Sequence, residues 1–164
     1  MRVYVDFETT GLSPLRERVV EVAAVEPGGR RFSMLARPEP EVMARLRFPL
    51  YPSGITKEEL DEALPLVTVA GMFKEWLQEL GPCTLWAYNS AFEMGFAQRE
   101  PWSIGRIHWG GCVMRKASRG GRYRKLRDVA ASFGLEWEGD AHRALADARM
   151  AMRVDARLDG RIAV

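Results

Sequence analysis

Hydrophobic and polar positions over the first 35 residues follow a pattern that predicts β-strands. Short apolar runs at residues 3–7, 19–25 and 31–35 have the length and the valine, alanine and aromatic content of strands. Residues 27–29, Pro-Gly-Gly, separate the last two runs and have the composition of a tight turn. We therefore expect the chain to begin with antiparallel β-structure that includes a hairpin.

The pattern then changes from strands to helices. Residues 37–54 are rich in proline and show no periodicity, which indicates a loop. Thr56 is a good N-cap for a short acidic helix that we expect to end at Pro65. Apolar residues recur at helical spacing over residues 67–80, so we expect a helix there that packs on the sheet and stops at Gly81.

The rest of the chain continues this alternation. Residues 84–88 have the pattern of a buried strand, and Asn89 or Ser90 then caps a helix that runs to about Arg99. The arginine-rich stretch that follows is expected to form a loop and a short helix. Two more helices are predicted, over residues 124–133 and 141–158. Together these elements predict an α/β fold with a central mixed sheet flanked by helices.

Length and composition narrow the class of protein. A chain of 164 residues, 47% of them hydrophobic, can build one sizeable core, so we expect a single domain over residues 1–164. No apolar stretch approaches the roughly 20 residues of a membrane span, and the N-terminus lacks a signal-peptide pattern. We expect a cytoplasmic protein without a membrane partner. Cys83 and Cys112 have no CxxC spacing and are expected to be reduced packing residues.

The net charge of +2 conceals a strongly basic segment. Nine basic residues and one acid, Glu100, occur from Arg99 to Arg127. One interpretation is a solvated basic surface. The other is a phosphate-rich partner, because clustered arginine and lysine displace counterions from a nucleic-acid backbone.

Two acids stand at the end of the first predicted strand. Alternate side chains of a strand share a face, so Asp6 and Glu8 project together and repel each other. A divalent cation removes this repulsion, and carboxylate oxygens are ligands that suit Mg²⁺ or Mn²⁺. Two acids at this spacing also occur at ordinary polar strand ends, so the pair alone leaves both interpretations open.

Further candidate groups lie at the starts of two predicted helices. Glu93 falls in the first turns of the helix after residues 84–88, and His142 precedes Asp147 by five residues. Residues five apart on a helix are separated by about 140° and cannot share a face. If His142 and Asp147 serve one site, the histidine must lie before the regular helix.

Three segments resemble the motifs of a known enzyme family in order and approximate spacing. DFETTGL at residues 6–12, NSAFE at 89–93 and HRALADA at 142–148 resemble those of the DEDDh exonucleases. This superfamily includes the epsilon-type proofreading exonucleases and RNase T. The resemblance extends over nearly the whole chain and implies the ribonuclease H-like fold.

The resemblance also implies a metal-dependent catalytic site. Asp6, Glu8 and Asp147 match three of the family's metal-binding acids, Glu93 occupies the place of the fourth, and His142 matches the general base. Two ions, Mg²⁺ or Mn²⁺, would support hydrolysis of the terminal phosphodiester from the 3′ end, with release of nucleoside monophosphates.

The same resemblance implies contacts with the substrate. Candidate substrate-binding residues in the motifs are Thr9, Thr10, Gly11, Leu12, Asn89 and Phe92, and the basic segment adds Arg122 and Arg124. Gly11 also fits a turn that requires a positive φ, and Phe92 fits equally well as a core residue of its helix. The two arginines are expected to contact phosphates rather than bases. An active site that must receive a lone 3′ end fits an unpaired terminus better than a duplex, so we expect a single-stranded partner with a free 3′ end, DNA favoured over RNA. A DNA polymerase or repair protein is a candidate further partner.

Glu93 departs from the family pattern, which has aspartate at this position. Glutamate keeps the charge and adds one methylene group, so it could bind metal or mark a weakened site. The alternative function is therefore a nucleic-acid-binding or polymerase-accessory module with little catalysis. The presence of His142 favours activity, because a pure binding module does not need a general base there.

Overall fold

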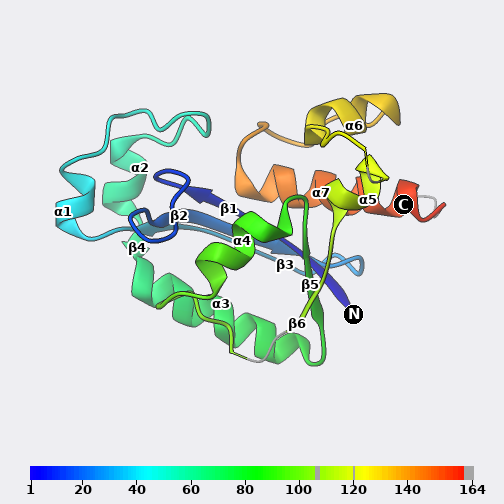
Figure 1. Ribbon diagram of the computed structural model, residues 1–164. Helices are drawn as coiled ribbons and strands as arrows, with labels where there is room; N and C mark the ends of the chain where they lie inside the picture. The colour runs from blue at the N-terminus through cyan, green and yellow to red at the C-terminus, as the bar shows by residue number, and fades with distance from the viewer. Residues whose placement is uncertain (106–107, 120, 161–164) are drawn as a thin grey trace.

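A six-stranded mixed sheet forms the centre of the molecule. The computed structural model describes residues 1–105, 108–119 and 121–160 (Figure 1). The strands lie in the order β4-β3-β2-β1-β5-β6. Their bounds are β1 (Arg2–Thr9), β2 (Val19–Val25), β3 (Arg31–Arg37), β4 (Leu64–Pro65), β5 (Thr84–Ala87) and β6 (His108–Cys112).

The first three strands form the predicted antiparallel unit. β1 pairs with β2 and β2 pairs with β3, both antiparallel. The β2–β3 hairpin turn is held by Glu26, whose carboxylate accepts hydrogen bonds from the backbone N–H groups of Gly28 (2.6 Å) and Arg30 (2.9 Å). Gly29 has a φ of +96°, a conformation that glycine adopts without a steric penalty. The hairpin prediction is confirmed.

The other half of the sheet is parallel and contains a strand that the sequence pattern did not predict. β5 pairs in parallel with β1 and with β6. Between residues 99 and 124 we expected only loop and a short helix, and β6 corrects this. Its sequence, HWGGC, lacks alternation because the indole of Trp86 on β5 lies against Gly110 and Gly111; a Cβ at Gly110 would stand 2.3 Å from Trp86 Nε1. A neighbouring strand therefore determines the composition of β6.

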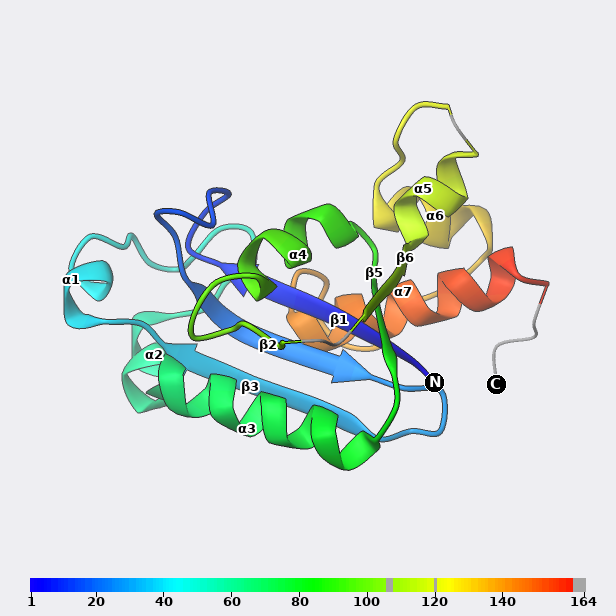
Figure 2. The same cartoon turned by 60° about the horizontal axis from the view of Figure 1, so that its bottom comes forward.

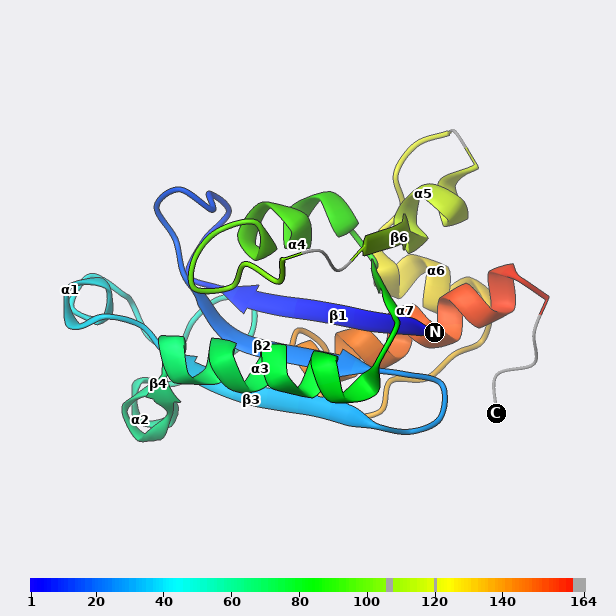
Figure 3. The same cartoon turned by 90° about the horizontal axis from the view of Figure 1, so that it is seen from below.

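Helices cover both faces of the sheet. They are α1 (Pro40–Met43), α2 (Lys57–Glu62), α3 (Leu66–Leu80), α4 (Ser90–Ala97), α5 (Val113–Ser118), α6 (Leu126–Ser132) and α7 (Ala144–Leu158). Val3, Val5 and Phe7 of β1 pack in one core with residues of α3 and α4, whereas Tyr4 packs in a second core with α5, α6 and α7 (Figures 2 and 3). None of the described helices has the length and hydrophobicity required to cross a membrane.

Several helix boundaries differ from the sequence prediction. The Thr56 hydroxyl and the Glu59 carboxylate form a reciprocal capping box at the start of α2, as expected of this N-cap. However, α2 ends at Glu62, because Leu64–Pro65 adds to β3 as the short strand β4. Asn89 is the N-cap residue of α4 but makes no capping side-chain hydrogen bond. The last helix starts at Ala144, after a non-helical segment that contains His142.

A buried carboxylate fastens the C-terminal end of α7 to the rest of the fold. Asp155 is fully buried and accepts hydrogen bonds from Arg2 (2.5 Å), the Tyr4 hydroxyl (2.6 Å) and Lys116 (2.6 Å). These partners belong to β1 and α5, so one side chain joins three elements. Arg2 and Lys116 also pair with Asp159, nearer the surface.

We expect Asp155→Ala to lower the free energy of unfolding by about 3 kcal/mol, because it leaves buried donors without their acceptor while Asp159 retains part of the pairing. Urea unfolding measures this loss. The matched control is Asp61→Ala, which removes an exposed i,i+4 pair with Lys57 and should cost less than about 1 kcal/mol. Equal losses in the two variants would contradict a structural role for the buried pair.

Candidate active site

Three carboxylates converge where β1 approaches the start of α7. Asp6 and Glu8 project from the same face of β1, and Asp147 lies in the first turn of α7. Each offers a carboxylate oxygen such that these atoms all lie within 4.8 Å of one another. The expected convergence of β1 and the third motif is therefore present in the fold.

His142 lies just before α7, in the place that the spacing argument required. It is exposed and adopts a left-handed conformation with φ of +64°. Its backbone N–H donates a hydrogen bond to Asp147 Oδ1 (3.1 Å). This bond links the loop that carries the imidazole to the helix that carries the acid.

Glu93 approaches the three acids from α4. It lies in the first turn of that helix and is only 4% exposed. Its Oε2 atom is buried and has no hydrogen-bond partner among the described residues. Glu93 is not a member of the close group of three acids, but its charge contributes to the raised pKa of Asp6. An orphaned carboxylate oxygen beside other acids is what a cation would satisfy.

Burial and mutual repulsion dominate the electrostatics of this group. Desolvation, followed by repulsion from Glu93, Asp147 and Glu8, raises the pKa of Asp6 well above its ordinary value. Desolvation together with Asp147 and Glu21 raises the pKa of Glu8 to about 8. Desolvation also raises the pKa of Glu93 to about 8 and that of Asp147, where the hydrogen bond from His142 opposes the shift. The acids are thus arranged to favour a proton or a metal ion between them.

The donor set fits a hard divalent cation. All four side chains offer carboxylate oxygens, the preferred ligands of Mg²⁺ and Mn²⁺, and none of the four is a sulfur or nitrogen donor. Asp6, Glu8 and Asp147 could hold such an ion directly, and Glu93 lies close enough to repel Asp6.

A buried ion pair behind the acids was missed by sequence reasoning. Glu21 of β2 lies directly opposite Glu8 in the β1–β2 pairing and is 5% exposed. It accepts hydrogen bonds from the Arg143 guanidinium (3.0 Å) and from the backbone N–H of Ala144 (3.0 Å). Arg143 also contacts Glu59 of α2 (3.2 Å). The only signal in the sequence was a single glutamate in the otherwise apolar strand VVEVAAV.

Side-chain hydrogen bonds within the segment that follows β1 stabilise its turn. The Thr9 hydroxyl donates to the carbonyl oxygen of Gly11 (2.7 Å), and the Thr10 hydroxyl donates to Glu17 (2.6 Å). Gly11 does not have a positive φ, so that expectation was wrong. A Cβ at this position would lie 3.0 Å from the Glu17 side chain, so any larger residue requires Glu17 to shift. Leu12 beyond it is 84% exposed.

The other substrate-binding candidates are divided between the core and the surface. Phe92 packs partly against the core, and its ring contacts that of Phe96 in a tilted arrangement with 5.2 Å between the centroids, so Phe92 contributes to core packing. Arg122 and Arg124 are exposed. Asn89 and Arg124 line the same cavity as His142 and Asp147. The Tyr88 hydroxyl donates to the carbonyl oxygen of Arg124 (2.6 Å), which ties this arginine to the strand end.

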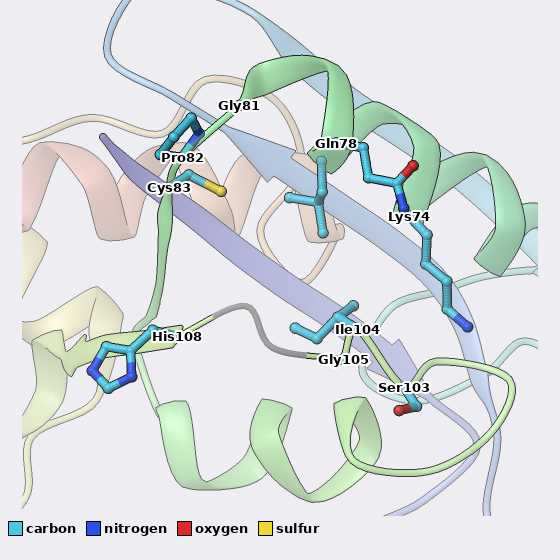
Figure 4. A pocket seen from close by; sticks show the side chains of 10 residues that line it. Lys74, Gln78, Gly81, Pro82, Cys83, Ser103, Ile104, Gly105 and His108 are labelled. Atoms are coloured by element: carbon cyan, nitrogen blue, oxygen red, sulfur yellow. The ribbon is translucent and has the colours of Figure 1, made fainter.

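A separate cavity lies on the face of the sheet that α3 covers, whereas Asp6 projects to the other face of β1. This cavity has a volume of about 710 Å³ and is lined by residues of α3 and of the segments beside β5 and β6, including Lys74, Cys83 and His108 (Figure 4). No carboxylate lines this cavity among the described residues, so the acidic site is distinct from it.

The chain belongs to the RNase T family of exonucleases, because the family model described as "Exonuclease" matches residues 3–154. Over 98 residues it is 39% identical to the DNA polymerase III PolC-type of Bacillus cereus and 37% identical to that of Bacillus subtilis. The matched region is 57% of this chain and 6% of each polymerase. The chain therefore corresponds to a small part of these much longer relatives.

Solved structures confirm the expected ribonuclease H-like fold. Cell-death related nuclease 4 (CRN-4) has a TM-score of 0.73 at 17% identity, covering 97% of this chain and 63% of that chain. A 3′-exonuclease that recognises the 3′ end of a histone mRNA stem-loop has a TM-score of 0.72 at 17% identity, covering 97% and 81%. Exonuclease I has a TM-score of 0.68 at 16% identity, covering 98% and 43%.

The raised pKa values predict how the metal-free protein responds to pH. Glu8 and Glu93 have pKa values of about 8 in the folded state against ordinary values of 4.5, so the folded state binds more protons than the unfolded state between these limits. The free energy of unfolding should therefore fall as pH rises from 4.5 to about 8 and then level off. Mg²⁺ or Mn²⁺ should reverse this loss, since it binds the deprotonated acids.

Thermal unfolding across this pH range, in EDTA and in excess metal, measures both effects. The control is Glu8→Gln, which should flatten the pH dependence in EDTA and reduce the stabilisation by metal. A melting temperature that rises with pH in EDTA would be incompatible with acids held at raised pKa.

The Glu21–Arg143 pair should position the third motif. We expect Arg143→Met to lower the rate of catalysis by about 10- to 100-fold, because it leaves Glu21 unpaired beside Glu8 and frees the start of α7. Adding Glu21→Gln removes the unpaired charge and should restore part of the rate. Steady-state kinetics of the single and double variants provide the test, and a double variant no better than Arg143→Met would exclude the electrostatic explanation.

Proposed function

We propose that this chain is a metal-dependent 3′–5′ exonuclease that removes nucleoside monophosphates from single-stranded or frayed ends. The observation that carries the proposal is the convergence of Asp6, Glu8 and Asp147, with His142 at the start of the helix that bears Asp147. Membership of the exonuclease family supports hydrolysis of nucleic acid as the reaction.

Asp6, Glu8 and Asp147 would hold Mg²⁺ or Mn²⁺, and Glu93 would complete the set directly or through water. When bound, a pair of such ions activates the attacking water and stabilises the negative charge on the leaving 3′ oxygen. The protein contributes a fixed group of acids from β1, α4 and α7, so that little reorganisation is needed when the substrate arrives.

His142 is the proposed general base. Its side chain is exposed and precedes the helix that carries Asp147, where an imidazole nitrogen can accept the proton of the attacking water. His142 precedes the helix that carries Asp147, and both residues line one cavity, in which the scissile phosphate would lie between the base and the metal ligands.

DNA is the favoured substrate, because the two Bacillus relatives are DNA polymerases by name. A DNA polymerase or a repair protein is accordingly a candidate partner. The exposed arginines, Arg122 and Arg124, would contact the phosphates of the strand without reading its bases.

A second candidate function follows from Glu93. Its absence from the close group of acids favours a module that binds nucleic acid or assists a polymerase with little catalysis. The buried, unpartnered Oε2 atom favours the opposite conclusion, since burial without a ligand is costly. We therefore give catalysis precedence.

Incubation with a 5′-labelled, 3′-unpaired DNA strand and its RNA counterpart should yield a ladder that shortens from the 3′ end in Mg²⁺ or Mn²⁺ and is absent in EDTA. His142→Ala should reduce the rate by about 10²- to 10⁴-fold and leave Mn²⁺ binding intact, because only the proton acceptor is lost. Asp6→Ala should abolish both cleavage and tight metal binding.

Calorimetric titration with Mn²⁺ separates these two effects. Cleavage retained in Asp6→Ala would exclude the metal-dependent mechanism. The control for the fourth acid is Glu93→Asp: a ladder with this variant and none with the wild type would favour the accessory module.

A further inference from the structure

A cavity of about 740 Å³ lies on the α6 and α7 side of the acidic group. Tyr51, from the loop between α1 and α2, and Tyr123, from the segment before α6, both line this cavity. His142 and Asp147 line its inner end. The volume lies within the range of about 300–1,000 Å³ that is typical of ligand sites.

Two tyrosine rings at this cavity face water. Tyr51 is 96% exposed and Tyr123 is 62% exposed, so neither ring contributes much to a core. Single exposed apolar residues are common and need no explanation. Here, however, two large aromatic side chains from segments about 70 residues apart in the chain line the same cavity as the candidate catalytic groups. Such a pair is suited to stack on a flat π-system.

The rim near Tyr123 is positively charged. Arg124, Lys125 and Arg127 line the cavity and are exposed. Arg127 lies 3.5 Å from Asp128, but no carboxylate of the described residues pairs with Arg124 or Lys125. The hydrogen bond from the Tyr88 hydroxyl fixes the backbone of Arg124 at this rim. Fixed cations next to exposed aromatic rings are the two features by which proteins hold single-stranded nucleic acid.

We infer that this cavity is a base-stacking subsite for a single strand, in which Tyr51 and Tyr123 stack on nucleobases close to the 3′ end while Arg124 and Lys125 bind the adjoining phosphates. The inference rests on the proposed function, since that function places the 3′ end beside His142. Stacking uses the face of a base and not its edge, so the subsite accepts all four bases. It thus makes the enzyme select single strands over paired ends, whose bases are already stacked.

The first experiment measures binding apart from catalysis. Single-stranded oligonucleotides that carry fluorescent 2-aminopurine at successive positions from the 3′ end are titrated with the full chain in EDTA, where no metal supports cleavage. Wild-type protein should quench the fluorescence at one or two adjacent positions. Tyr51→Leu and Tyr123→Leu should each weaken binding by about 5- to 100-fold and remove the quenching.

Three controls separate stacking from other effects. Tyr51→Phe and Tyr123→Phe keep the ring and should bind as the wild type does. Phe133→Leu removes an exposed ring just after α6, outside the cavity, and should also leave binding unchanged. Lys125→Ala should reduce the slope of log affinity against log salt by about one, whereas the tyrosine variants should leave this slope unaltered.

Cleavage in Mg²⁺ or Mn²⁺ distinguishes failure of the subsite from failure of the proposed function. The leucine variants should raise KM and leave kcat within about twofold, because the rings do not touch the reacting atoms. Leucine variants that bind like the wild type overturn the subsite even if the protein cleaves DNA. Loss of quenching in these variants supports the subsite even if the wild type does not cleave. If the wild-type protein binds none of the oligonucleotides, the subsite is overturned.

Discussion

The crowding of acids at the end of β1 is the constraint on which the rest of the structure depends. Asp6 and Glu8 share a strand face and meet Asp147 within a few ångströms, with Glu93 and Glu21 close behind. Removing such charges from water is costly unless a proton or a cation accompanies them. The surrounding fold must therefore hold these mutually repelling carboxylates close together. The hydrogen bonds and the ion pair that attach the start of α7 to Glu21 of β2 serve this purpose.

α7 is secured at both ends by ion pairs of different character. At its start, Arg143 and the backbone of Ala144 bind Glu21, which connects the helix to β2. Near its other end, the buried Asp155 accepts hydrogen bonds from Arg2, Tyr4 and Lys116. The first set lies beside the acidic site and the second at the far end of β1, so the helix is held in register with the strand that supplies the other acids.

Features that depend on local pattern or on a motif could be predicted from the sequence alone. The antiparallel start, the Thr56 cap and the position of His142 before the helix follow from periodicity and spacing, and they are found in the fold. Features created by contacts between distant segments were not predictable in this way. β6 depends on Trp86 of a neighbouring strand, and the Glu21–Arg143 pair joins residues 122 positions apart. Likewise, the sequence did not indicate that Tyr51 and Tyr123, both exposed, line one cavity.

The order of the strands affects the tendency of the protein to aggregate through its sheet edges. A sheet with long, regular edges invites pairing between molecules and hence aggregation. Here one edge is β4, two residues long and ending in Pro65, which has no amide N–H to donate to another strand. The opposite edge is β6, five residues that include two adjacent glycines covered by the indole of Trp86. β4 pairs only with Ala36 and Arg37, so residues 31–35 of β3 form the rest of that edge. β2 pairs with both β1 and β3 and is therefore shielded from edge-to-edge association.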